Sequence, residues 1–173
     1  MLVIAFIPWL IFWVFLGVHE PKPAALAACL AMLVVNVISL LRGKSLKILQ
    51  AATFVFFVAL SLLAFLTDLN RFWIWVRISA SLFLGLVALF SILLKRPFVL
   101  QYAREQSSKE VWDAPEFIEK SYAISWVWCG AFFLQLIVPA TRIFGFVPPK
   151  ILGPAFSILV FFAALKFSRL YSR

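Results

Sequence analysis

The chain has 173 residues, of which 65% are hydrophobic, 17% aromatic and 13% charged. A soluble domain is about half apolar and about a quarter charged, and a fold of this size cannot bury so much apolar surface in water. The net charge of +9 does not indicate nucleic-acid binding, because Lys and Arg stand in short gaps between apolar runs. The composition predicts an integral membrane protein.

In chain order, apolar runs predict an all-α fold, a polytopic membrane helix bundle that forms one domain over residues 1–173. A helix that crosses the hydrocarbon core needs about 20 apolar residues. The predicted transmembrane helices, about six, cover residues 2–18, 24–41, 48–67, 72–94, 122–140 and 151–167.

The first run, 2–18, has no Lys or Arg before it, whereas a signal peptide begins with a basic segment. We therefore expect a short spanning helix that tolerates Pro8 within the membrane. His19-Glu20-Pro21-Lys22-Pro23 predicts a tight turn, because its two prolines do not continue a helix.

The second run carries Ala24, Ala28 and Ala31 at helical spacing, with Ala27 beside them. Small residues at this spacing let two helices approach closely in lipid, so this face is expected to be a packing seam. A basic loop, 42–47, then leads to the third run.

The turn Asp68-Leu69-Asn70-Arg71 precedes the fourth run, which begins with Trp73 and Trp75, while the fifth run carries Trp126 and Trp128. Tryptophan gathers at the level of the lipid headgroups, so these four residues are predicted to form an interfacial aromatic belt.

Residues 95–121 form the one sizeable polar segment, a cytoplasmic amphipathic stretch that starts with Lys95-Arg96-Pro97. Phe98 and Tyr102 lie four residues apart, on one side of a short helix. Ser107-Ser108-Lys109-Glu110 matches a capping box, and Asp113-Ala114-Pro115-Glu116 is a second helix-start signal. The segment predicts two short helices at the membrane surface. The residues expected on its surface are Arg104, Glu105, Trp112 and Asp113.

The fifth and sixth runs are joined by the loop 141–150, which contains Pro148-Pro149, and a basic tail follows the sixth run. Pro139, Gly153 and Pro154 are residues that break helices, so these two runs are candidates for interrupted helices.

The distribution of basic residues predicts the orientation, because cytoplasmic loops are enriched in Lys and Arg. With six spans, the side that holds both termini receives most of them: Arg42, Lys44, Lys47, Lys95, Arg96, Arg104, Lys109, Lys120, Lys166, Arg169 and Arg173. The other side receives Lys22, Arg71, Arg142, Lys150 and, if its side chain reaches the interface, Arg77. Both termini are therefore expected in the cytoplasm, and a bacterial inner membrane fits this plain pattern.

Polar groups inside the predicted spans are the candidates for an intramembrane site, because charges in lipid are costly. Arg77 is the strongest candidate, with Asp68 as an expected partner; Asn36 and Gln135 are the other members. An Arg so close to a helix end more often extends to the interface or forms a structural ion pair. Intramembrane Ser, Asn and Gln residues mostly make hydrogen bonds between helices.

The inventory for catalysis is small. His19 is the one histidine, and Cys29 and Cys129 stand singly in apolar runs, where cysteines are usually packing residues. No metal-ligand spacing, phosphate loop or nucleophile elbow occurs in the sequence. We therefore expect that the protein is not an enzyme and binds no metal or cofactor. A lipid-modifying enzyme built on 95–121 ranks third, after the two functional hypotheses given below.

The layout resembles the intracellular septation protein A family of small bacterial inner-membrane proteins. The similar features are Ile7-Pro8 in the first helix, the alanine-rich second helix, the basic loop 42–47, Ser125-Trp126 followed by Phe132-Phe133, and the basic tail. The segment Gln101–Glu105 differs from that family's pattern. The resemblance implies non-enzymatic support of envelope synthesis and division through membrane partners.

Two functional hypotheses follow. The first is a non-catalytic inner-membrane protein that acts through helix–helix contacts, with the lipid bilayer and other integral membrane proteins or further copies of itself as partners. The alternative is a small transporter or channel with a polar intramembrane site around Arg77, as the 3 + 3 arrangement of helices would allow.

Overall fold

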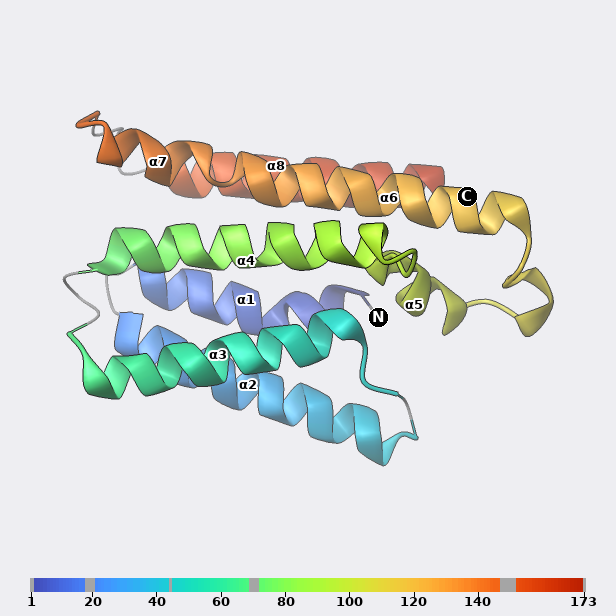
Figure 1. Ribbon diagram of the computed structural model, residues 1–173, viewed down its shortest axis with the longest axis horizontal. Coiled ribbons are helices and arrows are strands. Elements are labelled where there is room, and N and C mark those ends of the chain that lie inside the picture. The colour runs from blue at the N-terminus through green and yellow to red at the C-terminus, as the bar shows by residue number, and fades with distance from the viewer. Residues whose placement is uncertain (1, 18–20, 44, 69–71, 147–151, 173) are drawn as a thin grey trace. The chain divides into compact units, whose positions relative to one another are not determined.

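The computed structural model describes residues 2–17, 21–43, 45–68, 72–146 and 152–172, with the backbone alone for 2–5, 17, 73 and 154. These residues form helices and contain no strand (Figure 1). The chain divides into two units, Met1–Arg77 and Ile78–Arg173, with the boundary inside helix α4 (Trp73–Leu93). The predictions that concern His19-Glu20, Lys44, Asn70-Arg71, Pro148-Pro149 and Arg173 lie outside the described residues.

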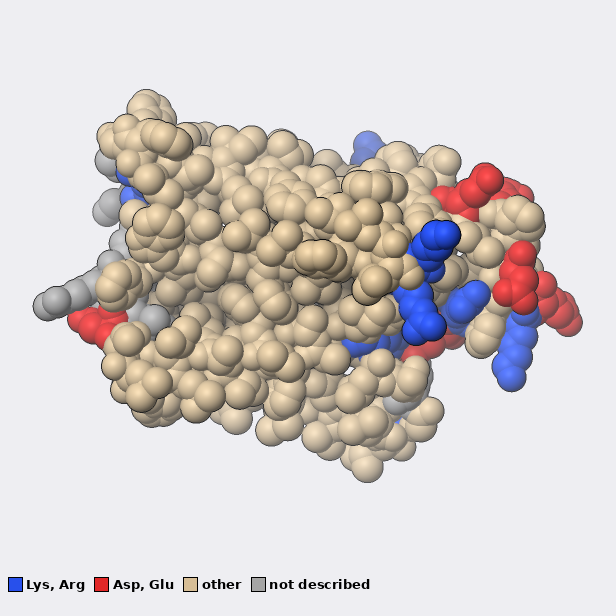
Figure 2. All heavy atoms as spheres, in the orientation of Figure 1, with Lys and Arg blue, Asp and Glu red and all other residues tan. Residues whose placement is uncertain are grey.

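Four helical segments are long and apolar enough to cross a membrane: Pro21–Leu41, Ile48–Leu66, Ile74–Leu93 and Pro115–Ile143. Their outer faces expose large aliphatic and aromatic side chains, and soluble proteins rarely expose so large an apolar area to water. On the face drawn in Figure 2, Asp, Glu, Lys and Arg are almost missing from the flanks of the helices and gather at their ends. The chain is thus a helical membrane protein.

In the first unit, helix α2 (Pro21–Leu41) packs against both α1 (Leu2–Gly17) and α3 (Ile48–Leu66) (Figure 1). The predicted alanine seam lies in this packing, since Ala24 and Ala28 are fully buried while Ala27 and Ala31 are partly exposed. The short side chains let the neighbouring helices approach α2 closely.

An aromatic cluster fills the space between α1 and α3. The Trp9 ring lies 4.7 Å from Phe57 and stacks on Phe56 at 5.5 Å, measured between ring centres, and Phe12 lies 5.3 Å from Phe57. The indole N–H of Trp9 donates a hydrogen bond to Thr53 Oγ1 at 3.2 Å, so the buried polar ends of both side chains are satisfied.

The start of α2 differs from the predicted turn. Pro21 and Pro23 lie in the first turn of the helix rather than before it. Proline is tolerated there because the first backbone N–H groups of a helix have no partner within it. The helix therefore begins three residues earlier than expected, at Pro21.

In the second unit, α4 ends in a reversal that returns the chain onto the unit. Arg96 N donates to Ser91 O and Lys95 N donates to Ile92 O, both at 2.9 Å. Lys95 has φ 57°, the left-handed conformation that glycine usually provides at this place. Ser91 Oγ then accepts a hydrogen bond from Phe98 N at 3.2 Å and fixes the start of the next helix.

The segment 95–121 contains one short helix, α5 (Phe98–Arg104), a 3-10 turn, η2 (Lys109–Val111), and from Pro115 the first turns of the next long helix. The first short helix forms where it is predicted, but Phe98, Val99, Leu100 and Tyr102 are buried. The predicted capping box needs Ser107 as the cap with Glu110 three residues later, but the 3-10 turn is capped at Ser108, which makes no side-chain capping bond.

The fifth run is longer than predicted and interrupted. Helix α6 (Pro115–Leu134) starts at the predicted signal Asp113-Ala114-Pro115-Glu116 and continues without a break into the run expected from 122. Pro115 and Glu116 suit a first turn, and Glu116 pairs with Lys120 at 2.9 Å. After Gln135 and Leu136 the chain continues as α7 (Ile137–Ile143). Pro139 explains the interruption, because it has no N–H to bond the Gln135 carbonyl and its ring crowds that carbonyl.

The sixth run forms α8 (Leu152–Tyr171), which packs against α6 and α7. Gly153 and Pro154 lie in its first turn and do not interrupt it. Where α4 and α6 approach each other, Cys129 Sγ lies 3.7 Å from Gly85 O, and a Cβ atom at Gly85 would lie 3.0 Å from the Phe133 ring. Cys129 is therefore a packing residue, as its apolar setting predicts.

Candidate functional site

Arg77, the strongest intramembrane candidate, lies near the start of α4 and is half-buried. Its guanidinium carbon lies 5.4 Å from the centre of the Trp13 ring of α1, so the charge is stabilised by a cation–π contact. Asp68 is exposed just beyond the end of α3. The pairing of Arg77 with Asp68 stays a prediction.

Asn36 is buried in α2, with 7% of its surface exposed, and its Oδ1 has no hydrogen-bond partner among the described residues. Ser61 Oγ, on α3, is in the same state. Each of these buried acceptors is costly within a membrane bundle, so a water or a further polar group would be stabilised beside either one.

Gln135 lies at the interruption between α6 and α7, and its side chain is satisfied by α8. Ser157 Oγ donates to Gln135 Oε1 at 2.7 Å, and Gln135 Nε2 donates to Ser157 O at 3.5 Å. The sequence predicts hydrogen bonds between helices for such residues, and Gln135 makes them.

The predicted aromatic belt is only partly exposed. Trp75 and Trp126 expose 57% and 51% of their surface, as a belt requires. Trp128 is fully buried: its ring lies 5.3 Å from Phe161 and its indole N–H donates to Ser168 Oγ at 3.0 Å. Its side chain therefore packs within the chain, and its place at the level of the headgroups stays a prediction. The side chain of Trp73 lies outside the described residues.

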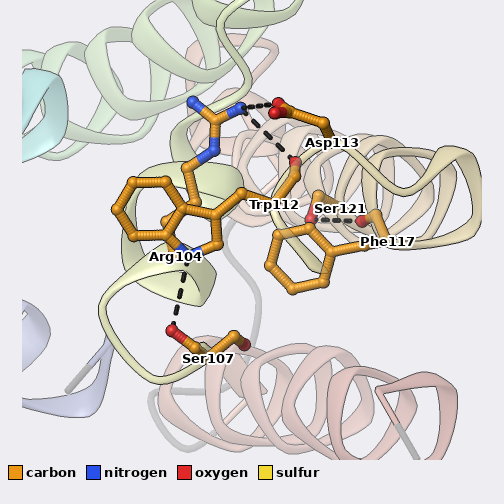
Figure 3. A network of polar contacts seen from close by, with 6 residues as sticks. All are labelled: Arg104, Ser107, Trp112, Asp113, Phe117 and Ser121. Carbon is orange, nitrogen blue, oxygen red and sulfur yellow. Dashed lines mark hydrogen bonds and ion pairs between the residues drawn. The ribbon is translucent and has the colours of Figure 1, made fainter. Parts of the chain in front are cut away.

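Three of the four surface residues predicted in 95–121, Arg104, Trp112 and Asp113, form a network across the connection between α5 and α6 (Figure 3). Arg104 Nη2 lies 3.7 Å from Asp113 Oδ1 and donates to Trp112 O at 3.5 Å. The guanidinium also lies 5.6 Å from the centre of the Trp112 ring, whose N–H donates to Ser107 O at 3.3 Å. Glu105 is exposed beside this network.

This network closes the segment upon itself. Trp112 and Arg104 are half-buried, whereas Asp113 exposes 96% of its side chain, so packing on Trp112 contributes more than the ion pair. Arg104 Nε is buried without a hydrogen-bond partner among the described residues. The arrangement orders a connecting loop and contains no nucleophile held by a base.

Tyr102 is buried in α5, with 2% of its surface exposed. Burial, and secondly the charge of Glu105, raise the pKa of its phenol well above the usual range. The phenol is therefore neutral at physiological pH and is not prepared to act as a base.

Two hydrogen bonds between helices could not be predicted from the sequence: Trp9 with Thr53 and Trp128 with Ser168. Hydropathy does not indicate such pairs, because its average over a window of residues is dominated by the apolar neighbours of each polar side chain. Among the described residues, no group of three or more His, Cys, Asp or Glu side chains could hold a metal ion.

No family model, curated protein or solved structure matches this chain. The functional argument therefore depends on the chain's own contacts and exposed faces.

Proposed function

We propose that this chain is a non-catalytic membrane protein that acts through helix–helix contacts with other integral membrane proteins. Three observed pairs support this: Trp9 with Thr53, Trp128 with Ser168, and Gln135 with Ser157. In each pair, polar groups of the spans are used to join helices of the same chain, which gives a self-supporting bundle that can present its outer faces to a partner.

The observation that carries the proposal is the outer face of α6. Trp126, Gly130 and Leu134 follow one another at intervals of four residues and are all exposed. A Cβ atom built on Gly130 would meet nothing within 4 Å, so the glycine leaves an open notch between two large side chains. Such a notch lets the backbone of a second helix approach closely, with the tryptophan as a large contact beside it.

The same proposal includes six spans, with α1 and α8 crossing in addition to the four long apolar segments. The apolar part of α1, Phe6–Leu16, is shorter than a usual span, and the last two turns of α8 carry Lys166 and Arg169. With six spans the basic residues favour both termini in the cytoplasm of a bacterium, so the inner membrane is the proposed location.

The resemblance to the intracellular septation protein A family supports a role near envelope synthesis and cell division. The partner is then an integral protein of that machinery, or a larger complex in which this chain is an accessory subunit. The segment Gln101–Glu105, which differs from the family pattern, lies in and just after α5, away from the α6 notch in the sequence.

Extraction in mild detergent, followed by mass identification of co-purifying proteins, tests the proposal. We expect a defined membrane protein at a fixed ratio, and its loss from the Gly130→Leu variant, which fills the notch. Ala59→Leu, at an exposed position of α3, is the matched control and should keep the partner. A chain that isolates alone, or a partner equally retained by Gly130→Leu, would overturn it.

A transporter or channel is the second candidate, and the interruption between α6 and α7 favours it. Broken helices inside the membrane line many transport sites. If the chain is a transporter, the Asn36 Oδ1, which has no hydrogen-bond partner among the described residues, and the half-buried Arg77 would face water. Cysteine substitution at Asn36 tests this: labelling by a charged thiol reagent in intact membranes is expected for a water path, and protection argues against it.

A further inference from the structure

The last turns of α8 carry a groove of mixed character. It is lined by apolar and basic side chains: Phe162, Leu165, Lys166, Arg169 and Leu170. Their spacing of three and four residues puts them on one face of the helix. Phe162 and Leu170 are more than half exposed, and both basic side chains are exposed.

The two basic groups of this groove are like charges only three residues apart, an arrangement that destabilises a helix when nothing neutralises it. No Asp or Glu follows Glu119 in the sequence, so α8 itself has no acidic residue. Among the described residues neither Lys166 nor Arg169 is in an ion pair, whereas Lys120 pairs with Glu116 and Arg104 with Asp113. Within the part of the chain that the structure describes, no carboxylate therefore neutralises the positive charge of the groove.

The order of residues along α8 matches the order of groups in a phospholipid. Ile158, Leu159 and Phe162 are exposed apolar side chains of the kind that contact acyl chains. One turn further on, the helix changes to the two cations, at the end where its C-terminal dipole is negative and cations are favoured. Basic pockets at the ends of membrane helices attract anionic headgroups, while the apolar residues beside them contact the chains.

We propose that this groove binds one anionic phospholipid of the membrane. Its phosphate lies between the Lys166 ammonium and the Arg169 guanidinium, and an acyl chain runs along Phe162 and Leu165. Arginine and lysine both bind phosphate oxygens strongly, arginine through two parallel N–H groups. The proposal depends on α8 crossing the membrane as described under the proposed function, but not on the partner that binds α6.

The test is native mass spectrometry of the full chain in mild detergent, titrated with phosphatidylglycerol or with phosphatidylcholine. We expect one phosphatidylglycerol to bind tightly and phosphatidylcholine to bind at least tenfold more weakly. Lys166→Gln with Arg169→Gln should weaken phosphatidylglycerol binding about 30-fold, as expected for two cations near a headgroup.

The matched control removes two exposed charges elsewhere, Arg42→Gln with Lys109→Gln, and should change the affinity less than about threefold. The charge-conserving pair Lys166→Arg with Arg169→Lys should keep the binding and shows that the helix tolerates substitution there. Equal affinity of the unaltered chain for the two lipids would overturn the proposal, and so would equal losses in both neutralised pairs. Because Gly130 is untouched in every variant, this outcome is independent of partner co-purification.

Discussion

Ser157 of α8 is held by the side chain of Gln135, which accepts from Ser157 Oγ at 2.7 Å and donates to Ser157 O at 3.5 Å. Gln135 is also the residue at which Pro139 interrupts the apolar segment Pro115–Ile143. One proline thus opens the helix ladder, and the polar side chain at the opening joins the broken segment to the last helix. The interruption is stabilised within the chain.

A double-mutant cycle measures this contact. Gln135→Met and Ser157→Ala should each lower the free energy of unfolding in detergent by about 1 kcal/mol, since hydrogen bonds between membrane helices contribute about that much. The double variant should lose less than the sum of the two, with a coupling energy of about 0.6–1.7 kcal/mol. Strict additivity would show that the two side chains do not act on each other.

Trp126 and Trp128 form a matched pair for a second prediction, because one is half exposed and the other buried on the same helix. Trp128→Phe removes the hydrogen bond to Ser168 and leaves a small void, so the free energy of unfolding should fall by about 1–3 kcal/mol. Trp126→Phe should change it by less than about 0.5 kcal/mol. Thermal unfolding in one detergent compares the two, and similar losses would contradict the observed burial.

The position of most helices was predictable from the sequence, since apolar runs long enough for a bilayer leave few alternatives. Helices α2, α3 and α4 begin and end within one turn of the predicted spans. The start of α6 was predictable from the signal Asp113-Ala114-Pro115-Glu116 but not from hydropathy, because Pro115–Ser121 is too polar to belong to an apolar run.

The candidate site was less predictable, because hydropathy gives no helix face. Residues two apart are rotated by about 200° around the helix axis and lie on nearly opposite faces, so Trp126 faces outward while Trp128 packs within the chain. The pairing of Arg104 with Trp112 and Asp113 arises from tertiary structure, over a separation that has no helical period. Only the presence of polar residues within apolar runs, as at Gln135, was a usable signal.

A third prediction separates packing from charge in the loop network. Trp112→Ala removes the ring that covers the Arg104 guanidinium and the bond to Ser107, so the segment should open more often. Trypsin should then cut after Arg104 or Lys109 at least several-fold faster, since cleavage follows the population of the open segment. Asp113→Asn, at a fully solvated carboxylate, should change the rate less than about twofold. Faster cleavage in Asp113→Asn alone would assign the order to the ion pair instead.

The fourth prediction concerns alkaline pH and Tyr102, whose pKa is raised by burial first and by Glu105 second. The folded chain holds the phenolic proton more tightly than the unfolded chain, where tyrosine has a pKa of about 10. This stabilisation is complete below that pH and is lost as the pH rises above it. Between about pH 9 and 11.5, the unfolding midpoint of the unaltered chain should fall more steeply than that of Tyr102→Phe. Tyr171→Phe, at an exposed tyrosine, controls for the loss of a phenol elsewhere. Parallel curves for the unaltered chain and Tyr102→Phe would show that Tyr102 ionises equally in both states, and the buried position of α5 against α6 would then be wrong.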